Sequence, residues 1–307
     1  MGGVAEDEAR KSAGGAAPRC EGCEVLIRAT LTRFAPAPTG YLHLGHVLNA
    51  HYVWDFARRT GASVLLRIED HDRGRCRPEY ETAILDDLDW LEFVPDVFPT
   101  SAFRTGHCEG RQTDRHDVYT AAARMLAERG LLYGCSCSRR EIAAADVRQE
   151  QGGTDELRYP GTCRGRGLPL RDDVAWRLKL EPGVEIFNDL ILGPQTQDPA
   201  AQAGDVAVRD RRGNWTYQFV AAVDDFRQGV DLVVRGRDLL ASTGRQLRIA
   251  RLLGRDTPAH FAHHELLMKS PTQKLSKSDR DTGVRDLRAA GWTREQVLAE
   301  ALKSLRT

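Results

Sequence analysis

RFAPAPTGYLHLGH, residues 33–46, is a turn-forming segment that ends in two closely spaced histidines. Two prolines and a glycine among its first eight residues oppose a regular helix, so we expect this part to form a loop. His43 and His46 follow, separated by one leucine and one glycine. The segment therefore predicts a stiff, shaped turn that presents two imidazoles.

The sequence on either side of this turn predicts a βαβ unit. Residues 25–34, VLIRATLTRF, are typical of a buried strand, and apolar residues recur at helical spacing between residues 44 and 61. A second strand, SVLLRIE, follows at residues 63–69. This order is characteristic of a parallel, doubly wound α/β sheet, in which ligands bind beyond the carboxyl ends of the strands. The turn therefore lies where such a fold binds its substrate.

The bulk composition is that of a soluble globular protein. The chain has 307 residues, 41% of them hydrophobic, which is enough for a sizeable core and more than one domain. No apolar run approaches the roughly 20 residues that cross a bilayer, and the N-terminus lacks the pattern of a secretory signal, so we expect a cytoplasmic protein. The formal net charge is zero, so a nucleic-acid partner must bind to local basic surface.

Composition and periodicity divide the chain into five segments. These are a flexible N-terminal extension (1–24), the first half of the α/β domain (25–132), an insertion rich in cysteine, glycine and arginine (133–174), the remainder of the insertion with the second half of the α/β domain (175–255), and a short helical C-terminal region (256–307).

Further helices and strands are predicted inside these segments. The expected helices are residues 78–91, 114–130 and 238–253, and the expected strands include DVAVRD and WTYQFV on either side of the turn RRGN. The C-terminal helix carries one apolar stripe, formed by Val297, Ala301, Leu302 and Leu305.

Two short motifs suit the binding of phosphates. In HLGH, Gly45 allows close approach of the backbone to a ligand, and the helix that begins there directs unsatisfied N–H groups at an anion. His43 and His46 can donate hydrogen bonds to the same phosphate oxygens. KLSKS, residues 274–278, supplies Lys274 and Lys277 for a mobile loop that closes on a polyphosphate. Read alone, each motif also fits an ordinary surface turn or a lysine-rich surface loop.

Together and in this order, about 230 residues apart, HLGH and KLSKS resemble the HIGH and KMSKS signatures of class I aminoacyl-tRNA synthetases. RFAPAPTGYLHLGH, RIEDHD and VVRGRDLL resemble the glutamyl branch of that family, and this resemblance covers the chain from Arg33 to its end. It implies a Rossmann-type catalytic domain that condenses ATP with glutamate into an adenylate and transfers the glutamyl group to RNA. It assigns catalytic roles to His43, His46, Lys274 and Lys277, and places ATP, with Mg²⁺, against His43, Gly45, His46 and Lys277.

The same resemblance places the glutamate substrate on Arg33, Glu69, Tyr217 and Arg235. Guanidinium groups suit the two carboxylates of glutamate, the Glu69 carboxylate suits its ammonium, and the Tyr217 hydroxyl can fix its orientation. Which arginine takes which carboxylate stays open. Two structural alternatives also remain: Glu69 paired with Arg67 or Arg73, and Tyr217 packed in the core of an apolar strand.

CSC and YPGTC resemble the three-cysteine, one-tyrosine zinc site of these enzymes. They supply Cys135, Cys137, Tyr159 and Cys163, and two pairs of donors at this spacing can close a tetrahedron around zinc. Free thiols are the alternative, since seven cysteines without an export signal do not suggest a disulfide framework. Four cysteines have no predicted role: Cys20 and Cys23, an isolated CxxC in the N-terminal extension, and the single residues Cys76 and Cys108.

The C-terminal region is short for an ordinary glutamyl-tRNA synthetase, because only about 29 residues follow Ser278. We therefore expect no large helical anticodon-binding domain. This arrangement resembles the glutamyl-Q tRNA(Asp) synthetases, which attach glutamate to queuosine in the anticodon loop of tRNA(Asp). The resemblance implies ATP, L-glutamate and queuosine-bearing tRNA(Asp) as partners of a monomeric ligase. The alternatives are a truncated glutamyl-tRNA synthetase that charges a tRNA 3′ end, a nucleotidyltransferase outside translation, and a catalytically inactive RNA-binding module.

Overall fold

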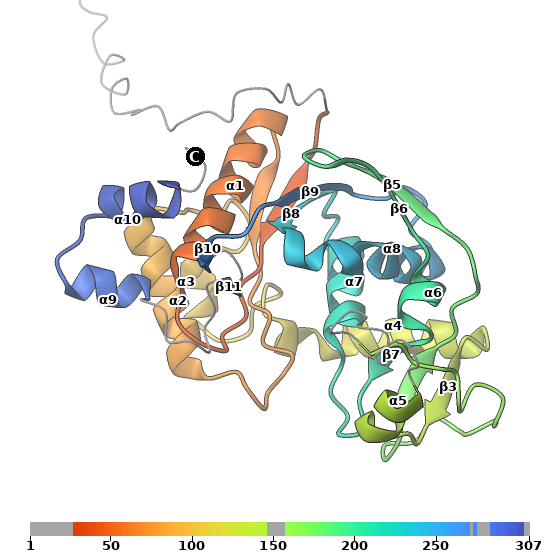
Figure 1. The fold of residues 1–307 in the computed structure, drawn as a ribbon. Coiled ribbons are helices and arrows are strands. Elements are labelled where there is room, and N and C mark those ends of the chain that lie inside the picture. Colours follow the sequence, from red (N-terminus) through yellow and green to blue (C-terminus); the bar gives the residue numbers. More distant parts are fainter. Residues whose placement is uncertain (1–26, 146–156, 271–272, 275–282, 304–307) are drawn as a thin grey trace, which may run out of the picture.

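The computed structural model describes residues 27–145, 157–270, 273–274 and 283–303 (Figure 1). In this part of the chain, none of the helices combines the length and the apolar character that a membrane span needs. The elements are arranged around a six-stranded sheet and a three-stranded sheet.

The predicted βαβ unit is confirmed at the N-terminal side of the larger sheet. Strand β1 (Leu31–Phe34), helix α1 (Leu44–Thr60) and strand β2 (Ser63–Leu66) follow in this order, and β1 pairs parallel with β2. Helix α1 ends at Gly61, where a φ of +79° needs a residue without a side chain. Both strands are shorter than predicted, so Glu69 lies in the loop beyond β2.

The larger sheet has the strand order β2-β1-β8-β9-β5-β6. It is completed by β5 (Glu185–Asp189), β6 (Gly193–Gln197), β8 (Leu232–Gly236) and β9 (His260–His264). All pairs are parallel except β5 with β6, so the predicted α/β fold is confirmed as a mostly parallel sheet. The expectation of a fully parallel sheet is wrong at β6, because the short connection after β5 can join only antiparallel strands.

A smaller antiparallel sheet lies beside the first one in Figure 1. It consists of β3 (Leu132–Cys135), β4 (Ala175–Leu178) and β7 (Val206–Arg209), and its connections carry two short helices, α5 (Arg139–Ala145) and α6 (Pro199–Ala203). The chain thus leaves the larger sheet at β3, returns to it with β5 and β6, and leaves it again at β7. The division of the chain into five segments stays a prediction.

The predicted strand WTYQFV is wrong, because its last four residues begin helix α7 (Tyr217–Arg227). Six apolar and aromatic residues fit a strand when they are read alone. In the structure, however, burial continues from Phe219 through Asp225 along one helix, against a core that Trp215 joins. The Thr216 hydroxyl donates to the carbonyl of Ala207 at 2.6 Å, which holds the start of this helix against β7.

The remaining elements include helices close to the predicted ranges 78–91, 114–130 and 238–253 and the expected helical C-terminal region, and also short elements at residues 100–103, 268–270 and 273–274 that were not predicted. They are α2 (Pro78–Leu91), α3 (Thr100–Phe103), the 3₁₀ turn η1 (Gln112–Arg115), α4 (His116–Glu128), the 3₁₀ turn η3 (Arg237–Ser242), α8 (Thr243–Leu252), β10 (Met268–Ser270), β11 (Gln273–Lys274), α9 (Val284–Ala289) and α10 (Arg294–Ala301). Figure 1 shows α9 and α10 on the same side of the sheet as α2 and α1, and these helices share one core. Val297, Ala301 and Leu302 are buried there, while Leu305 lies outside the described residues.

Candidate active site

The HLGH turn forms the N-terminal cap of α1. His43 is the capping residue, and its Nδ1 accepts a hydrogen bond from the Gly45 backbone N–H at 3.1 Å. The Nδ1 of His46 accepts one from the His43 backbone N–H, also at 3.1 Å, and the two ring centroids lie 3.9 Å apart. Because both Nδ1 atoms are acceptors, each neutral ring carries its hydrogen on Nε2. Both imidazoles are thus hydrogen-bond donors at the positive end of a helix dipole, which suits an anion.

Gly45 has a structural role in this turn in addition to the predicted one. A Cβ at this position would lie 3.0 Å from His43 Cε1 and 3.1 Å from His43 Nδ1. The absence of a side chain therefore leaves room for the imidazole that caps the helix.

The chain that follows KLSKS returns to the same turn. Gly283 forms an isolated antiparallel bridge with His43, and the backbone N–H of Val284 donates to the carbonyl of Leu42 at 2.8 Å. Lys274 lies in β11, while Lys277 falls outside the described residues. The six residues from Lys277 to Gly283 span at most about 20 Å when extended. The HLGH turn is thus in direct contact with the chain that begins five residues after KLSKS.

Arg33 and Arg67 share one buried carboxylate. Arg33, on β1, donates through Nε to Asp225 Oδ1 at 3.1 Å and to the carbonyl of Val234 at 3.2 Å. Arg67 donates to the same Asp225 oxygen at 2.8 Å. Burial alone would raise the pKa of Asp225, but the two guanidinium groups lower it to about 2. Arg33 uses two of its five N–H donors in these contacts, and the others can serve a ligand.

Glu69 and Tyr217 lie on the same side of this cluster. Glu69 accepts a hydrogen bond from Arg67 Nη2 at 3.2 Å, so the structural pairing with Arg67 is present. Tyr217 is the first residue of α7 and is half-buried, so the alternative of a core tyrosine in a strand is wrong. Burial raises the pKa of Tyr217, and the residue also interacts electrostatically with Glu69, Arg235 and Arg33. All four predicted glutamate-binding residues are therefore brought together.

Arg235 differs from Arg33 in its partners, which are all neutral acceptors. It is buried on β8 and donates to His263 Nε2 at 3.0 Å, Gln246 Oε1 at 2.6 Å and Thr243 Oγ1 at 2.8 Å. His263 can accept because its Nδ1 donates to Asp189 Oδ2 at 2.5 Å. Burial lowers the pKa of Arg235, since no carboxylate is hydrogen-bonded to it among the described residues. Its charge and two of its five N–H donors are therefore left for an anionic ligand.

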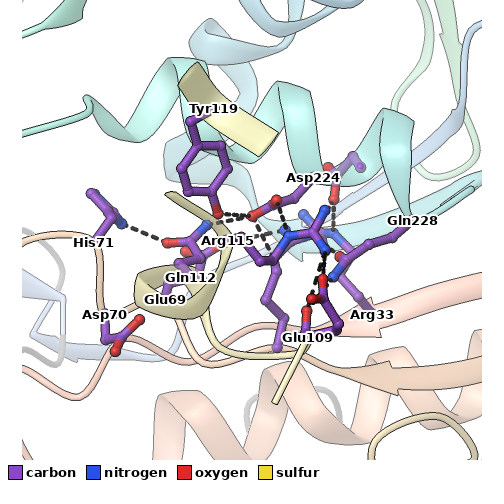
Figure 2. Close-up of polar contacts among 12 residues, drawn as sticks. Arg33, Glu69, Asp70, His71, Glu109, Gln112, Arg115, Tyr119, Asp224 and Gln228 are labelled. Carbon is purple, nitrogen blue, oxygen red and sulfur yellow. Dashed lines mark hydrogen bonds and ion pairs between the residues drawn. The ribbon is translucent and has the colours of Figure 1, made fainter. Parts of the chain in front are cut away.

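Sequence reasoning missed the second layer of polar residues behind this pocket, which Figure 2 shows. Asp224 is fully buried and accepts hydrogen bonds from Arg115, Gln112 and Tyr119, while Arg115 also contacts Glu109. The only signal in the sequence was the acidic pair in VDDF, because two carboxylates inside an apolar segment need buried cationic partners. The partners themselves come from distant segments and carry no local pattern.

The four predicted zinc ligands also converge. The Sγ atoms of Cys135, Cys137 and Cys163 lie within 4.8 Å of one another. The Tyr159 hydroxyl lies 3.3 Å from Cys135 Sγ and 3.9 Å from Cys137 Sγ, and accepts the Cys163 backbone N–H at 2.8 Å. Burial opposes the thiolate of Cys163, but hydrogen bonds from Ser136 and its sulfur and tyrosine neighbours lower its pKa to about 7. Three thiols that face one another at this distance fit a tetrahedral metal ion.

Comparison with known proteins agrees with this geometry. The family model of class I tRNA synthetases (E and Q), catalytic domain, matches residues 29–304. The glutamyl-Q tRNA(Asp) synthetase of Bordetella bronchiseptica is 44% identical over 252 residues, which cover 80% of this chain and 74% of the relative. That of Rhodobacter capsulatus is 38% identical over 278 residues, which cover 85% of this chain and 95% of the relative.

A solved structure shows the same fold. The glutamate tRNA ligase from Elizabethkingia meningosepticum, in complex with its amino acid, superposes with a TM-score of 0.68 at 28% identity. The match covers 86% of this chain but only 54% of that ligase. The chain described here belongs to the class I tRNA synthetases of the glutamyl and glutaminyl type, and among them to the glutamyl-Q tRNA(Asp) synthetases.

Proposed function

We propose that the protein is an ATP-dependent ligase that activates glutamate as glutamyl adenylate and transfers the glutamyl group to queuosine in the anticodon of tRNA(Asp). The name of its relatives supports the acceptor. The single observation that carries the activation step is the meeting of two buried arginines with Glu69 and Tyr217, on a chain that leads from Arg33 through ten residues to a helix N-terminus capped by an imidazole.

In this proposal the pocket recognises both ends of glutamate. Arg235, with neutral partners only, takes one carboxylate, and Arg33, which shares Asp225 with Arg67, takes the other. Glu69 pairs with the ligand ammonium, and the Tyr217 hydroxyl fixes the direction of the substrate backbone.

The nucleotide binds on the HLGH side of the pocket. His43 and His46 donate through Nε2 to phosphate oxygens, and Gly45 keeps the capping geometry. Lys274 and Lys277 supply cationic charge to the pyrophosphate that departs, and Mg²⁺ bound to ATP neutralises the remaining charge. A glutamate carboxylate oxygen attacks the α-phosphorus, pyrophosphate leaves, and the protein acts by alignment and charge stabilisation.

Cys135, Cys137, Tyr159 and Cys163 are proposed to hold a structural Zn²⁺. The support is the convergence of three sulfur atoms and one phenolic oxygen at the edge of the smaller sheet. Bound zinc would tie β3 to the loop that contains Tyr159 and Cys163, and no catalytic step passes through it.

The test uses the whole chain, radiolabelled glutamate, ATP and tRNA(Asp) isolated with and without queuosine. We expect labelling of the queuosine-bearing tRNA only, with the label recovered on the modified nucleoside after nuclease digestion. Labelling of both tRNA(Asp) preparations at the 3′ adenosine would overturn the proposed acceptor.

A second candidate is the charging of a tRNA 3′ end, as the name of the Elizabethkingia ligase implies for that protein. The shared fold and pocket favour it, but the match covers only 54% of the ligase. Unmodified tRNA(Glu), added to the same assay, separates the two: glutamylation of that RNA favours the second candidate.

The other two candidate functions, an inactive RNA-binding module and a nucleotidyltransferase outside translation, differ in whether they form the adenylate. An inactive RNA-binding module forms no adenylate, whereas a nucleotidyltransferase outside translation forms it but transfers to no RNA. Glutamate-dependent exchange between ATP and pyrophosphate, followed by transfer, excludes both. We also propose that the enzyme is a monomer and that it acts in the cytoplasm, where tRNA and ATP are available.

A further inference from the structure

A buried carboxylate fixes the orientation of the Gln112 side chain. Asp224 Oδ2 accepts a hydrogen bond from Gln112 Nε2 at 2.8 Å and another from the Tyr119 hydroxyl at 2.9 Å, while Oδ1 accepts from Arg115 Nε at 2.8 Å. A carboxylate paired with arginine is an acceptor only. The amide nitrogen of Gln112 must therefore face Asp224, and its carbonyl oxygen must face away from it.

That carbonyl oxygen fixes the tautomer of His71. Gln112 Oε1 lies 2.6 Å from His71 Nδ1, and Figure 2 shows His71, Gln112 and Asp224 connected in one line. Because an amide oxygen only accepts, the hydrogen lies on His71 Nδ1. The neutral ring then has its lone pair on Nε2, where it can accept a hydrogen bond or a proton.

His71 lies between the glutamate pocket and a separate cavity. Its ring centroid is 6.3 Å from that of Tyr217, and it lines a cavity of about 360 Å³ together with Arg73, Thr113, His116 and Trp215. His116 has the opposite tautomer, because its Nδ1 accepts from the Trp215 indole N–H at 3.3 Å. The cavity thus offers an acceptor imidazole, a donor imidazole and an aromatic face, and its volume suits a nucleoside.

We propose that His71 is the general base of the transfer step, held in its reactive tautomer by Gln112 and Asp224. The acceptor hydroxyl, from a nucleoside in this cavity, attacks the carbonyl carbon of glutamyl adenylate. Its proton passes to His71 Nε2, the new C–O ester bond forms, and the bond to the phosphate oxygen breaks, so that AMP leaves with the electron pair. This inference rests on the proposed function, which supplies the adenylate and the RNA hydroxyl.

The two half-reactions are tested separately in the full-length enzyme. Adenylate formation is followed by glutamate-dependent ATP–pyrophosphate exchange, and transfer by single-turnover kinetics with preformed adenylate and the tRNA that the wild type charges. His71→Ala is expected to slow transfer by about 10²-fold while exchange changes by less than about threefold. His71→Gln restores an acceptor but no base and should stay slow. His107→Ala is the control, because His107 is an exposed histidine that pairs only loosely with Glu109.

Added imidazole gives a readout that a purely structural role would not change. It is expected to restore part of the transfer rate of His71→Ala and to leave exchange unaffected. The inference is overturned if His71→Ala transfers at the wild-type rate, if exchange falls as far as transfer, or if imidazole restores nothing. A wild type that forms adenylate but transfers to no RNA overturns the proposed function itself, and this inference with it.

Discussion

Arg33 and Arg235 are both buried beside the proposed glutamate pocket, but their positive charges are compensated to different extents by neighbouring groups. Arg33 shares the Asp225 carboxylate with Arg67, so its charge is already partly compensated. Arg235 is surrounded by the neutral acceptors His263, Gln246 and Thr243. A buried cation without a counter-ion gains the most from an incoming carboxylate, so Arg235 should contribute more to glutamate binding.

Arg235→Lys tests this difference. Lysine keeps the charge but cannot contact three acceptors and a carboxylate at once, so we expect the KM for glutamate in ATP–pyrophosphate exchange to rise by roughly 10- to 100-fold. Arg237→Lys is the matched control, because Arg237 is exposed and pairs with Glu265 at the surface. Equal KM values for the two variants would contradict the role of Arg235.

Gly45→Ala tests the capping of α1. The added methyl group would lie 3.0 Å from His43 Cε1, so the ring must shift by a few tenths of an ångström and its hydrogen bond from the residue 45 N–H is weakened. We expect a loss of about 1 kcal/mol in the free energy of unfolding, measured by urea titration, and at least a tenfold slower exchange reaction. In Gly165→Ala the new methyl group meets no atom within 4 Å, and both quantities should stay at wild-type values.

The identities of the pocket residues were predictable from the sequence, whereas most of their partners, apart from Arg67 at Glu69, were not. Arg33, Glu69, Tyr217 and Arg235 were assigned through resemblance, and they do meet in space. Gln112 and Asp224 are 112 positions apart, and their contact depends on how η1 and α7 pack. No local pattern encodes such a contact, so the tautomer of His71 could be derived only from the structure.

Helices α2 and α9 enclose a carboxylate that lacks one hydrogen bond. Asp87 on α2 is buried, and its Oδ2 has no partner within the described residues. Burial raises its pKa from 3.8 to about 7, although Arg288 on α9 lowers it. Between these two pKa values the folded protein keeps the proton of Asp87, whereas the unfolded chain releases it. The protonated carboxyl therefore contributes its full stabilisation below pH 3.8, and this stabilisation is lost as the pH rises through 7.

Asp87→Asn removes this titration. At pH 8 the variant should unfold at a higher temperature than the wild type, by an amount that corresponds to about 2 kcal/mol, and this difference should be clearly smaller at pH 5. Asp86→Asn, at an exposed neighbour that pairs with Arg104, should show no such pH-dependent gain. Thermal unfolding of the three proteins at both pH values checks this. If the unfolding temperatures of Asp87→Asn and the wild type differed equally at pH 5 and pH 8, the raised pKa of Asp87 would be contradicted.

If the cysteine cluster between β3 and the Tyr159 loop binds zinc, the purified protein should contain that metal. We expect about one zinc ion per chain by elemental analysis, and loss of that ion in Cys163→Ser together with a lower unfolding temperature. Cys76→Ser keeps all four proposed ligands and should retain the metal. Zinc-free wild type, or equal zinc in both variants, would show that these thiols are not a zinc site.

Helix and strand predictions succeeded where the periodic pattern of apolar residues extended over many positions. Helix α2 has the predicted bounds, because a proline at its start and fourteen residues of periodic burial leave little ambiguity. WTYQFV failed because six residues are too few to distinguish a strand from the first turns of α7. The antiparallel edge strand β6 was not predicted either. Its residues are exposed at alternate positions, and a sequence with so few buried residues looks like that of many loops.

The molecule as a whole is arranged so that the HLGH turn near the N-terminus contacts the start of the C-terminal helices. The bridge between His43 and Gly283 joins the start of α1 to the chain just after KLSKS, across 240 positions of sequence. The parallel order of β1, β8 and β9 places Arg33 and Arg235 on neighbouring strands. Neighbouring parallel strands thereby position the two arginines of the proposed amino-acid pocket, and the loop after β1 leads into the HLGH turn.

The most direct test of this arrangement is a crystal structure with a non-hydrolysable analogue of glutamyl adenylate. We expect the glutamyl carboxylate within hydrogen-bond distance of Arg33 or Arg235, the ammonium against Glu69, and the phosphate mimic at the Nε2 atoms of His43 and His46. An analogue bound elsewhere, or with its adenylate away from the HLGH turn, would contradict it.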